Sequence, residues 1–445
     1  MPLQTPSSNT TIYLDQPPSC LQFCPASPNH FVVGTYLLSE TKSTDENGEE
    51  QVIAQKKTGS LQLWKIDEVK DELTQIYRYV IDAAVFDIQF RDRNGTSNAK
   101  SPSNIFAIAT SDASVSLFTV STESESDSGF TCLWTSSVHE DPSVPSLYLA
   151  WLPENWLPIH QANSDGFAVT FSDGLTKVFS IKDPITEKVK SDEEGKTTEL
   201  GTYEAKQPIE IWFVSAASYP TLLDTSTTEG GSAEGFLSAP YLFTGNDFGS
   251  LTTRRFSDVS SNQPQSQLEG EGQDGERDED KDHEIAPILS TDDKALHHTA
   301  GITSILPLPI PLSHPLAAGS PLLLTGSYDE YIRVYHAAGR GKVLGELGLG
   351  GGVWRLQVLD TNEGENGEWT FLVLASCMHG GTRVVKVCIG GSEEEVGIEV
   401  LAEFTEHESM NYASDVWRGE GEALELRVVS SSFYDKRVCV WRVTV

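Results

Sequence analysis

The sequence predicts an all-β fold, a seven-bladed β-propeller, from three observations. Stretches with helical periodicity are nearly absent, and short runs of alternating apolar and polar residues take their place. Turns rich in Gly, Ser, Asp and Pro separate these runs. The same hairpin pattern recurs seven times, and residues 321–335 are its clearest copy: an apolar strand, a polar turn around Asp329, and a second alternating strand. Blades of this kind form rings of about four to eight.

The seven repeats each end in a strand with a terminal aromatic or apolar residue. Their last turns and strands cover residues 59–64, 111–118, 172–179, 247–256, 326–335, 380–387 and 434–441. The spacing between them is longer than the roughly 40–45 residues of a WD repeat. Three polar stretches account for the excess: 40–50, 188–199 and 257–284. Because such stretches cannot bury apolar area, we expect them to be disordered loops.

The predicted ring is a single WD-repeat domain over residues 1–445. A chain of 445 residues exceeds the size at which one compact core stops growing, which favours a repeat architecture. The chain ends at Val445, directly after the last aromatic strand, so another segment has to complete the seventh blade. We expect the strand-like segment at about 11–14 to do so.

The composition narrows the function classes. The net charge is −34 and the pI about 4.5, which argues against direct binding of nucleic acid, because phosphate contacts need a basic footprint. No run is long enough to span a bilayer, and the six cysteines lack zinc-site spacing. We expect a cytoplasmic monomer with reduced thiols that contacts no membrane and needs no metal or other cofactor.

One set of polar residues resembles a catalytic triad but has a structural interpretation. WD repeats carry a hydrogen-bond network of a His before the blade, a Ser or Thr in a strand, an Asp in a turn, and a Trp. His298, Thr325 or Ser327, and Asp329 fit this pattern, with Tyr335 in the Trp position. We therefore expect Asp329 to bond the loop histidine and hold the blade together. The G-x-S-x-G, H-E-x-x-H and Walker A motifs are absent, so a catalytic site would have to come from loops at one end of the ring.

The last third of the chain resembles one family of WD-repeat proteins. The motifs that carry the resemblance are residues 298–301, 325–330, 351–355, 377–380, 407–417 and 432–435, with residues 34–36 near the start. They are similar to diphthine methyl ester hydrolase, a family of diphthamide biosynthesis whose members carry the name diphthine methyltransferase. The Gly-Gly-Val-Trp-Arg sequence followed by Cys-Met-His-Gly-Gly is the specific part. The stretch 205–212 departs from the family's A-H-Q-F-E-A-W motif, because it lacks the histidine and has one residue more.

The resemblance implies a carboxylic-ester hydrolase. Its substrate would be methylated diphthine, a modified histidine of translation elongation factor 2, which would be the partner. The chemistry needs an activated water or nucleophile, donors for an oxyanion, and aromatic faces for a trimethylammonium group. An alternative function is that of a non-catalytic scaffold that positions a protein client, because fold does not imply function.

Candidate residues follow from these needs. His379 is the candidate base, Arg355 is the candidate group that binds the developing oxyanion or the product carboxylate, and Ser409 is a candidate nucleophile. The candidate cation-binding aromatics are Trp354, Tyr412, Trp417 and Tyr434. Each has a structural alternative: a turn-capping histidine, an inter-blade salt bridge for Arg355, and propeller core for the aromatic rings.

Overall fold

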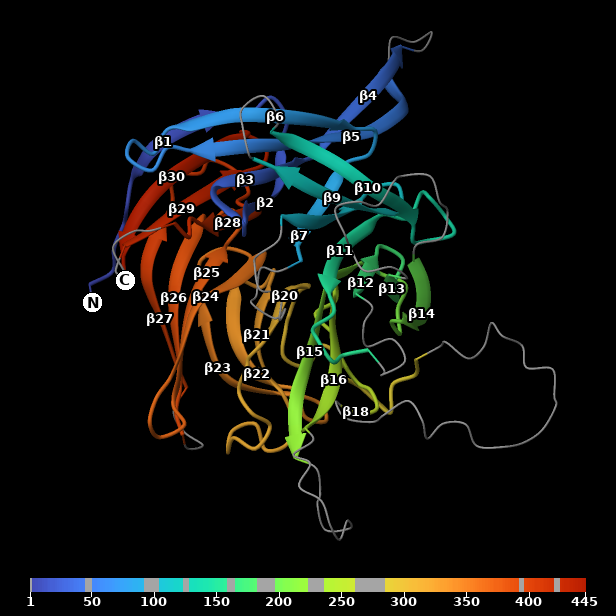
Figure 1. The fold of residues 1–445 in the computed structure, drawn as a ribbon, viewed down its shortest axis with the longest axis vertical. Coiled ribbons are helices and arrows are strands. Elements are labelled where there is room, and N and C mark those ends of the chain that lie inside the picture. The colour runs from blue at the N-terminus through green and yellow to red at the C-terminus, as the bar shows by residue number, and fades with distance from the viewer. Residues whose placement is uncertain are drawn as a thin grey trace, which may run out of the picture.

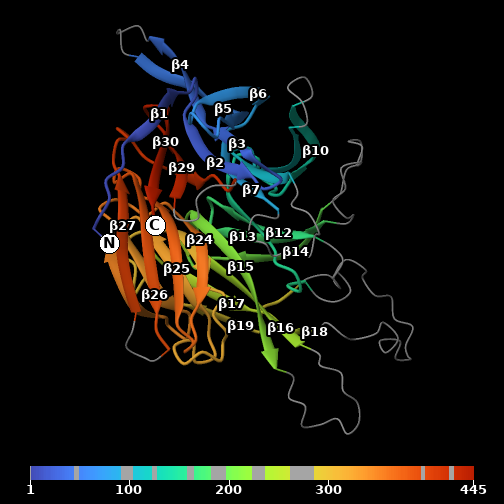
Figure 2. The same cartoon turned by 60° about the vertical axis from the view of Figure 1, so that its left-hand side comes forward.

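The fold is a seven-bladed β-propeller (Figures 1 and 2). The structure, a computed structural model, describes residues 2–44, 50–91, 104–122, 128–157, 165–181, 197–222, 236–260, 285–391, 396–419 and 425–445. Within these ranges every regular element is a strand, and the strands pair into seven sheets. Alternating side chains bury one face of each sheet against the next blade, which is why the repeats form a ring.

The first three blades follow one another along the chain. The first contains β2 (Pro18–Cys24), β3 (Ser27–Thr35), β5 (Glu50–Ile66) and β6 (Leu73–Ile81), and β4 (Leu37–Thr44) pairs with β5. The second contains β7 (Val85–Phe90), β8 (Ile105–Thr110), β9 (Ser114–Ser121) and β10 (Gly129–Ser137). The third contains β11 (Ser146–Trp151), β12 (Gly166–Phe171), β13 (Leu175–Ile181) and β14 (Thr197–Glu204).

The next three blades repeat the same antiparallel order. The fourth contains β15 (Ile211–Leu222), β16 (Phe236–Asn246), β17 (Leu251–Arg255) and β19 (Leu289–Asp292), and β18 (Val259–Ser260) pairs with β16. The fifth contains β20 (Ile302–Pro307), β21 (Leu322–Ser327), β22 (Tyr331–His336) and β23 (Lys342–Gly348). The sixth contains β24 (Arg355–Glu363), β25 (Trp369–Ser376), β26 (Thr382–Ile389) and β27 (Val396–Phe404).

The seventh blade joins the two ends of the chain. It contains β28 (Ala413–Val416), β29 (Glu425–Ser432) and β30 (Arg437–Thr444), and its outer strand is β1 (Ser8–Tyr13), which pairs antiparallel with β30. Gln4, ahead of β1, forms a parallel bridge to Ala402 of the sixth blade. Both termini therefore lie on the same side of the ring in Figure 1.

The predicted insertions include residues that form strands in the structure. Residues 40–44 and 50 lie in β4 and β5, which form a hairpin that projects from the first blade (Figure 1). Residues 197–199 lie in β14, and 259–260 form β18. The assignment of these parts to loops was wrong. Strands pair through backbone groups, so a polar sequence can form a strand without an apolar pattern. The rest of the inserts, 45–49, 188–196 and 261–284, lies outside the described residues, apart from 257–258, which are in neither strand.

The inner strands are fastened to one another by a repeated hydrogen bond. A side-chain oxygen on the inner strand of one blade accepts a backbone N–H from the inner strand of the next blade. The four donor–acceptor pairs are Phe90–Gln22, Leu149–Asp87, Leu356–Ser304 and Phe23–Asp415. The last of these crosses from the seventh blade to the first, so the same device operates at the point of ring closure.

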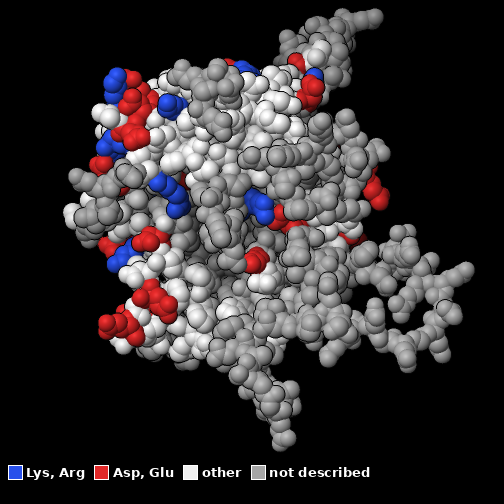
Figure 3. All heavy atoms as spheres, viewed as in Figure 1, with Lys and Arg blue, Asp and Glu red and all other residues white. Residues whose placement is uncertain are grey.

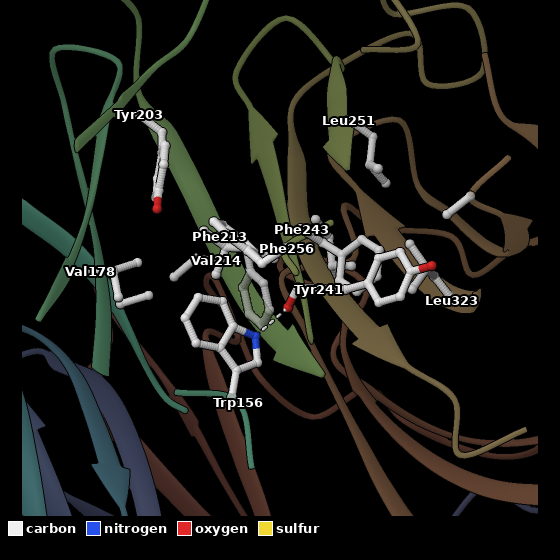
Figure 4. Close-up of a cluster of buried hydrophobic side chains, with 14 of the residues drawn as sticks. Trp156, Val178, Tyr203, Phe213, Val214, Tyr241, Phe243, Leu251, Phe256 and Leu323 are labelled. Carbon is white, nitrogen blue, oxygen red and sulfur yellow. Dashed lines mark hydrogen bonds between the residues drawn. The ribbon is translucent and has the colours of Figure 1, made fainter. Parts of the chain in front are cut away.

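Apolar side chains fill the space between blades. Figure 4 shows one such cluster, which joins the third, fourth and fifth blades. Trp156 is 2% exposed and donates its indole N–H to the carbonyl oxygen of Tyr241, 2.9 Å away. Because each blade buries its faces against both neighbours, the position of every inner strand is fixed by the whole ring.

Among the described residues, a histidine ahead of the inner strand bonds into its blade in the third, fifth and seventh blades. In the third, Nε2 of His139 lies 3.0 Å from a carboxylate oxygen of Asp173 in the turn between β12 and β13. In the fifth blade, Nε2 of His298 lies 2.9 Å from Oγ1 of Thr325. Asp329 bonds the backbone N–H of Thr299 instead of the histidine ring, and Tyr335 donates to Asp293. The expectations for these two contacts were therefore wrong.

The seventh blade has the fuller network. Ser430 lies 2.8 Å from Nε2 of His407 and accepts the indole N–H of Trp441 at 3.0 Å. Burial lowers the pKa of His407 to about 4 and that of His298 to about 3, so both rings are neutral at pH 7.

The surface charge is mixed on the face shown in Figure 3. Lys and Arg side chains lie among Asp and Glu along the left-hand edge, and the described residues of this face form no continuous basic patch. All six cysteines are free, and four of them are buried. No helix among the described residues is long and apolar enough to cross a membrane.

Candidate functional site

Partly exposed aromatic rings gather at one mouth of the central channel. In every blade, the start of the inner strand lies beside the turn between the second and third strands, which we call the b–c turn. The rings come from these two places in six of the seven blades. We call them the aromatic arc: Phe86, Tyr36, Phe433, Tyr412, Trp354, Tyr328 and Trp212.

The rings of the arc are in continuous contact. Ring centroids lie 5.6 Å apart for Phe86 and Tyr36, 6.0 Å for Tyr36 and Phe433, and 5.4 Å for Phe433 and Tyr412. Beyond Tyr412, Trp354 lies at 5.0 Å, and Trp354 is 5.6 Å from Trp212 and 5.8 Å from Tyr328. Edge-to-face and tilted contacts of this kind add stability beyond area burial and leave ring faces accessible at the rim.

Arg355 reaches across the channel next to the arc. It is the first residue of β24, in the sixth blade, and Nη1 donates to the carbonyl oxygen of Thr303, 2.8 Å away in the fifth blade. Its guanidinium carbon lies 4.5 Å from the ring centroid of Trp354. It also lies 4.8 Å from the ring of Tyr148 in the third blade and 5.4 Å from that of Phe213 in the fourth. Aromatic faces therefore hold a fixed positive charge inside the mouth.

Asp87 is the buried carboxyl group of the same channel. It lies on β7, is 4% exposed, and accepts a hydrogen bond from Nε2 of Gln89 at 3.0 Å. Burial raises the pKa of Asp87 to about 6, and the positive charge of Arg355 opposes that rise. Gln89 also donates to the hydroxyl group of Tyr148, whose ring contacts Arg355. The sequence gives Asp87 no motif, so only the ring geometry identifies it.

His379 lies on the same end of the ring but stands in solvent. It occupies the b–c turn of the sixth blade, and its side chain is 58% exposed. Nε2 lies 3.6 Å from a carboxylate oxygen of Glu330, in the b–c turn of the fifth blade. Glu330 has φ 74° and Met378, next to His379, has φ 41°, so both turns use the left-handed region with side chains larger than glycine.

Ser409 has a structural position. Its hydroxyl group donates to Asp435 at 3.1 Å and accepts the backbone N–H of Tyr434 at 2.8 Å. These bonds tie the loop before β28 to the b–c turn of the seventh blade. The structure does not bring Ser409 into contact with His379 or Arg355.

The four predicted aromatic residues divide into three groups. Trp354 and Tyr412 belong to the arc. Tyr434 is 68% exposed and contacts the arc through Phe433, at 5.1 Å between centroids. Trp417 follows the far end of β28, where its indole N–H bonds Asn29 and Arg427 stacks on its ring, so it lies away from this mouth.

Sequence reasoning missed most of the arc. Tyr36, Tyr328 and Phe433 lie inside the family motifs at 34–36, 325–330 and 432–435, but neither they nor Trp212 and Phe86 were proposed as site residues. The signal that would identify all five is their place in the repeat. Phe86 and Trp212 are the second residues of inner strands, and the other three directly follow a second strand. Aligning the seven repeats on these positions places all of them at one end of the ring.

Other parts of the molecule offer less chemistry. A hollow on the sixth blade is lined by Glu368, Trp369, Cys388 and Val396, at the end of the blade opposite to Arg355. Within the described residues, His, Cys, Asp and Glu side chains form no group of three that would hold a metal ion.

Comparisons with known proteins agree with the motifs. No family model matches the chain. A protein of Schizosaccharomyces pombe named diphthine methyltransferase is 35% identical over 149 residues, which are 34% of this chain and 39% of that protein. Proteins of the same name from Homo sapiens and Mus musculus are 30% identical over 118 residues and 32% identical over 94 residues. These two matches cover 26% and 21% of this chain, and 23% and 18% of the relatives.

Solved structures agree with the fold. A chain in the crystal structure of a mitotic checkpoint complex superposes with a TM-score of 0.51 at 12% identity, covering 100% of this chain and 98% of that one. Saccharomyces cerevisiae Sqt1 gives a TM-score of 0.49 at 11% identity, with 99% of this chain and 100% of that chain covered. At such identities the likeness concerns architecture alone. The sequence matches span well under half of each curated relative. Over about a third of its length, the chain is a sequence relative of the proteins named diphthine methyltransferase.

Proposed function

We propose that this chain hydrolyses the methyl ester of methylated diphthine on translation elongation factor 2. The relatives' name points to diphthamide biosynthesis, and the motif resemblance points to the ester-hydrolysing step within it. The observation that carries the proposal is the placement of Arg355: a guanidinium group held by aromatic faces at the mouth of the channel, beside the aromatic arc. A positive group and a π surface side by side suit a substrate that carries both an ester and a quaternary ammonium.

Arg355 would bind the ester oxygens. Both of its hydrogen bonds to described residues come from Nη1, which leaves Nη2 and Nε to donate to a ligand oxygen. When water adds to the ester carbonyl, negative charge develops on that oxygen. A fixed guanidinium stabilises this charge without reorganisation, and it then binds the product carboxylate.

His379 would act as the base. It would take a proton from the attacking water, and the imidazolium would return that proton to the departing methoxide, so that methanol leaves and a carboxylic acid remains. The acid then loses its proton to solvent. Glu330, 3.6 Å from Nε2, would orient the ring and stabilise its charged form. A water nucleophile fits this site better than Ser409, whose hydroxyl group is bonded within its own turn.

The decisive experiment uses elongation factor 2 that carries methylated diphthine. After incubation with the purified chain, mass spectrometry should show a loss of about 14 Da on the modified histidine, the difference between a methyl ester and an acid. Arg355→Lys keeps the charge and loses the planar fork, and we expect its kcat to fall about 100-fold. His379→Ala should fall by a similar factor of about 100. Unchanged mass with a folded sample would refute the proposal.

A scaffold function is the second candidate. It is favoured by the exposure of His379 and by the absence, among the described residues, of any hydrogen bond between His379 and a Ser or Cys side chain. In that case the arc would bind a protein client without changing it. Stable binding of elongation factor 2 with no loss of methyl would support the scaffold.

A further inference from the structure

A corner of two perpendicular rings lies at one end of the aromatic arc. Trp212 begins the inner strand of the fourth blade, and Tyr328 lies in the b–c turn of the fifth. Their centroids are 6.1 Å apart and their planes meet at 89°. Both side chains are partly exposed. Two ring faces in this arrangement form adjacent walls, and a cation placed between them lies within about 6 Å of both centroids.

A carboxylate stands beside this corner. Asp247, in the b–c turn of the fourth blade, accepts the indole N–H of Trp212 at 2.6 Å. Burial, together with the negative charges of Asp247 and Glu210, raises the pKa of Tyr328, so its ring stays neutral and keeps an electron-rich face. The corner therefore combines π faces with negative charge. Among the described residues, Arg355 is the cation that acts on Tyr328, and its positive charge opposes the rise in the pKa of Tyr328.

Gly301 makes the corner possible. A Cβ atom at this position would lie 2.8 Å from the ring of Tyr328 and 3.0 Å from a carboxylate oxygen of Asp247. Only a residue without a side chain lets these two groups approach each other here. Gly301 belongs to the His-Thr-Ala-Gly segment that leads into β20. Its place between Tyr328 and Asp247 explains why this position holds a glycine.

Trp354 lies next to both the corner and Arg355. Its ring centroid is 4.5 Å from the guanidinium carbon and 5.6 Å and 5.8 Å from the ring centroids of Trp212 and Tyr328. Because like charges repel, a ligand cation cannot share the Trp354 face with Arg355. It is directed to the corner instead, while a carboxyl or ester group of the same ligand is directed to Arg355.

We propose that Trp212, Tyr328 and Asp247 form a subsite for a quaternary ammonium group, and that Arg355, which contacts the neighbouring Trp354 ring, receives the carboxyl oxygens attached to the same carbon. The proposal rests on the proposed function for the identity of the ligand. It adds the residues that would distinguish a permanently charged trimethylammonium group from an uncharged group of the same size. None of the three is among the residues that the sequence motifs suggest for cation binding.

The test uses choline and its uncharged isostere, 3,3-dimethylbutan-1-ol. Both are titrated into the full chain while NMR follows the indole N–H signal of Trp212, assigned by its loss in Trp212→Leu. We expect choline to shift the signal and to bind at least about 10-fold more tightly than the isostere, because a desolvated cation–π contact contributes roughly 1–2 kcal/mol. Equal affinities would overturn the proposal.

Variants locate the subsite. Tyr328→Leu and Asp247→Asn should each weaken choline binding about 5-fold or more, and Gly301→Ala should do so by moving Tyr328 away from Asp247. Tyr13→Leu is the matched control, because this exposed aromatic residue lies on β1, the outer strand of the seventh blade, and should leave the affinity unchanged. Thermal unfolding checks that each variant is folded. Choline binding that survives in Tyr328→Leu and Asp247→Asn would place the ammonium elsewhere.

The two proposals fail separately. If choline binds at the corner but methylated diphthine keeps its methyl group, the subsite stands and the esterase does not. If the methyl group is lost while the corner variants process the substrate with wild-type KM, the esterase stands and the subsite does not. A rise in KM for methylated diphthine in the corner variants, with little change in kcat, would support both proposals.

Discussion

At the scale of single residues, several b–c turns carry a residue other than glycine where glycine would have the lowest conformational energy. These turns need one residue in the left-handed region. Three blades use glycine there, Gly174, Gly249 and Gly381, but the second, fifth and seventh use Ala113 at φ 60°, Glu330 at φ 74° and Lys436 at φ 58°. A side chain in this region costs about 1–2 kcal/mol. Under the proposed function, the carboxylate of Glu330 would offset this cost by orienting His379.

This strain gives a paired prediction. Lys436→Gly should raise the free energy of unfolding by up to about 1 kcal/mol, because relief of strain outweighs the added freedom of the unfolded chain, and should leave turnover unchanged. Glu330→Gly should give a similar stability gain and lower turnover, because His379 loses its partner. Urea unfolding and the methyl-loss assay measure the two effects. Full turnover in Glu330→Gly would remove Glu330 from the mechanism.

Two buried histidines make stability depend on pH. His407 and His298 have pKa values of about 4 and 3 in the folded chain, against 6.5 when unfolded. Between these limits the unfolded chain binds more protons, so stability is complete above about pH 6.5 and is lost as the pH falls. Asp87, raised from 3.8 to about 6, has the opposite sign: its contribution is complete below 3.8 and is lost as the pH rises through 6.

Acidification should destabilise the protein, because groups that favour the unfolded chain at low pH outnumber those that oppose it. The two histidines and five carboxyl groups with lowered pKa values act in the first direction, and Asp87 and Asp293, with raised pKa values, act in the second. From pH 6.5 to 5, His407→Gln should reduce the slope of unfolding free energy against pH by about 1 kcal/mol per pH unit. Urea unfolding at several pH values measures the slope, and Asp87→Asn should steepen it. A slope that His407→Gln leaves unchanged would contradict a neutral buried ring.

At the scale of elements, the histidine network of the seventh blade is stronger than that of the fifth. Ser430 joins both His407 and Trp441, whereas Thr325 bonds His298 and Tyr335 bonds elsewhere. Ser430→Ala leaves two buried polar groups without a partner, and each costs about 1–3 kcal/mol. We expect Ser430→Ala to destabilise the chain by about twice as much as Thr325→Val, as measured by urea unfolding. Equal losses would show that the indole bond of Trp441 contributes nothing.

Strand length explains why one predicted aromatic residue lies outside the site. Tyr412 and Trp417 are close in sequence and flank β28, so they lie at its two ends, about 16 Å apart at 3.3 Å per residue. A sequence motif that contains a whole strand therefore has residues at both ends of the ring. The reverse holds for Phe86 and Tyr328, which are far apart in sequence but lie at the same end of the ring. The start of an inner strand, where Phe86 lies, and the b–c turn, where Tyr328 lies, are at the same end of a blade.

At the scale of the whole molecule, architecture was predictable and the site only partly so. The recurring hairpins predict the ring, and β1 occupies the place that residues 11–14 suggested. Arg355, Trp354 and Tyr412 were singled out and lie at one mouth. Asp87 and Trp212 could not be found in the same way, because their roles depend on which blades become neighbours and on distances that only ring closure sets.

Ring closure itself can be tested by removing its outer strand. A chain that lacks residues 2–14 loses β1 and the contact of Gln4 with Ala402, and it exposes the edge of β30. We expect a lower melting temperature and association between copies, seen by size-exclusion chromatography. A synthetic peptide of residues 2–14 should restore both, and the same peptide with Thr11→Pro should not, because proline removes a ladder donor. A truncated chain with the wild-type melting temperature would mean that β1 does not contribute to the stability of the ring.

The side chain of Arg355 links two blades that are far apart in the ring. The sixth and third blades are three steps apart in a circle of seven, as far from each other as blades can be, yet Arg355 on one contacts Tyr148 on the other. Side chains from the two blades therefore meet across the axis of the ring beside the arc. A change at Tyr148 in the third blade would reach Arg355 directly, although no strand of the third blade pairs with a strand of the sixth.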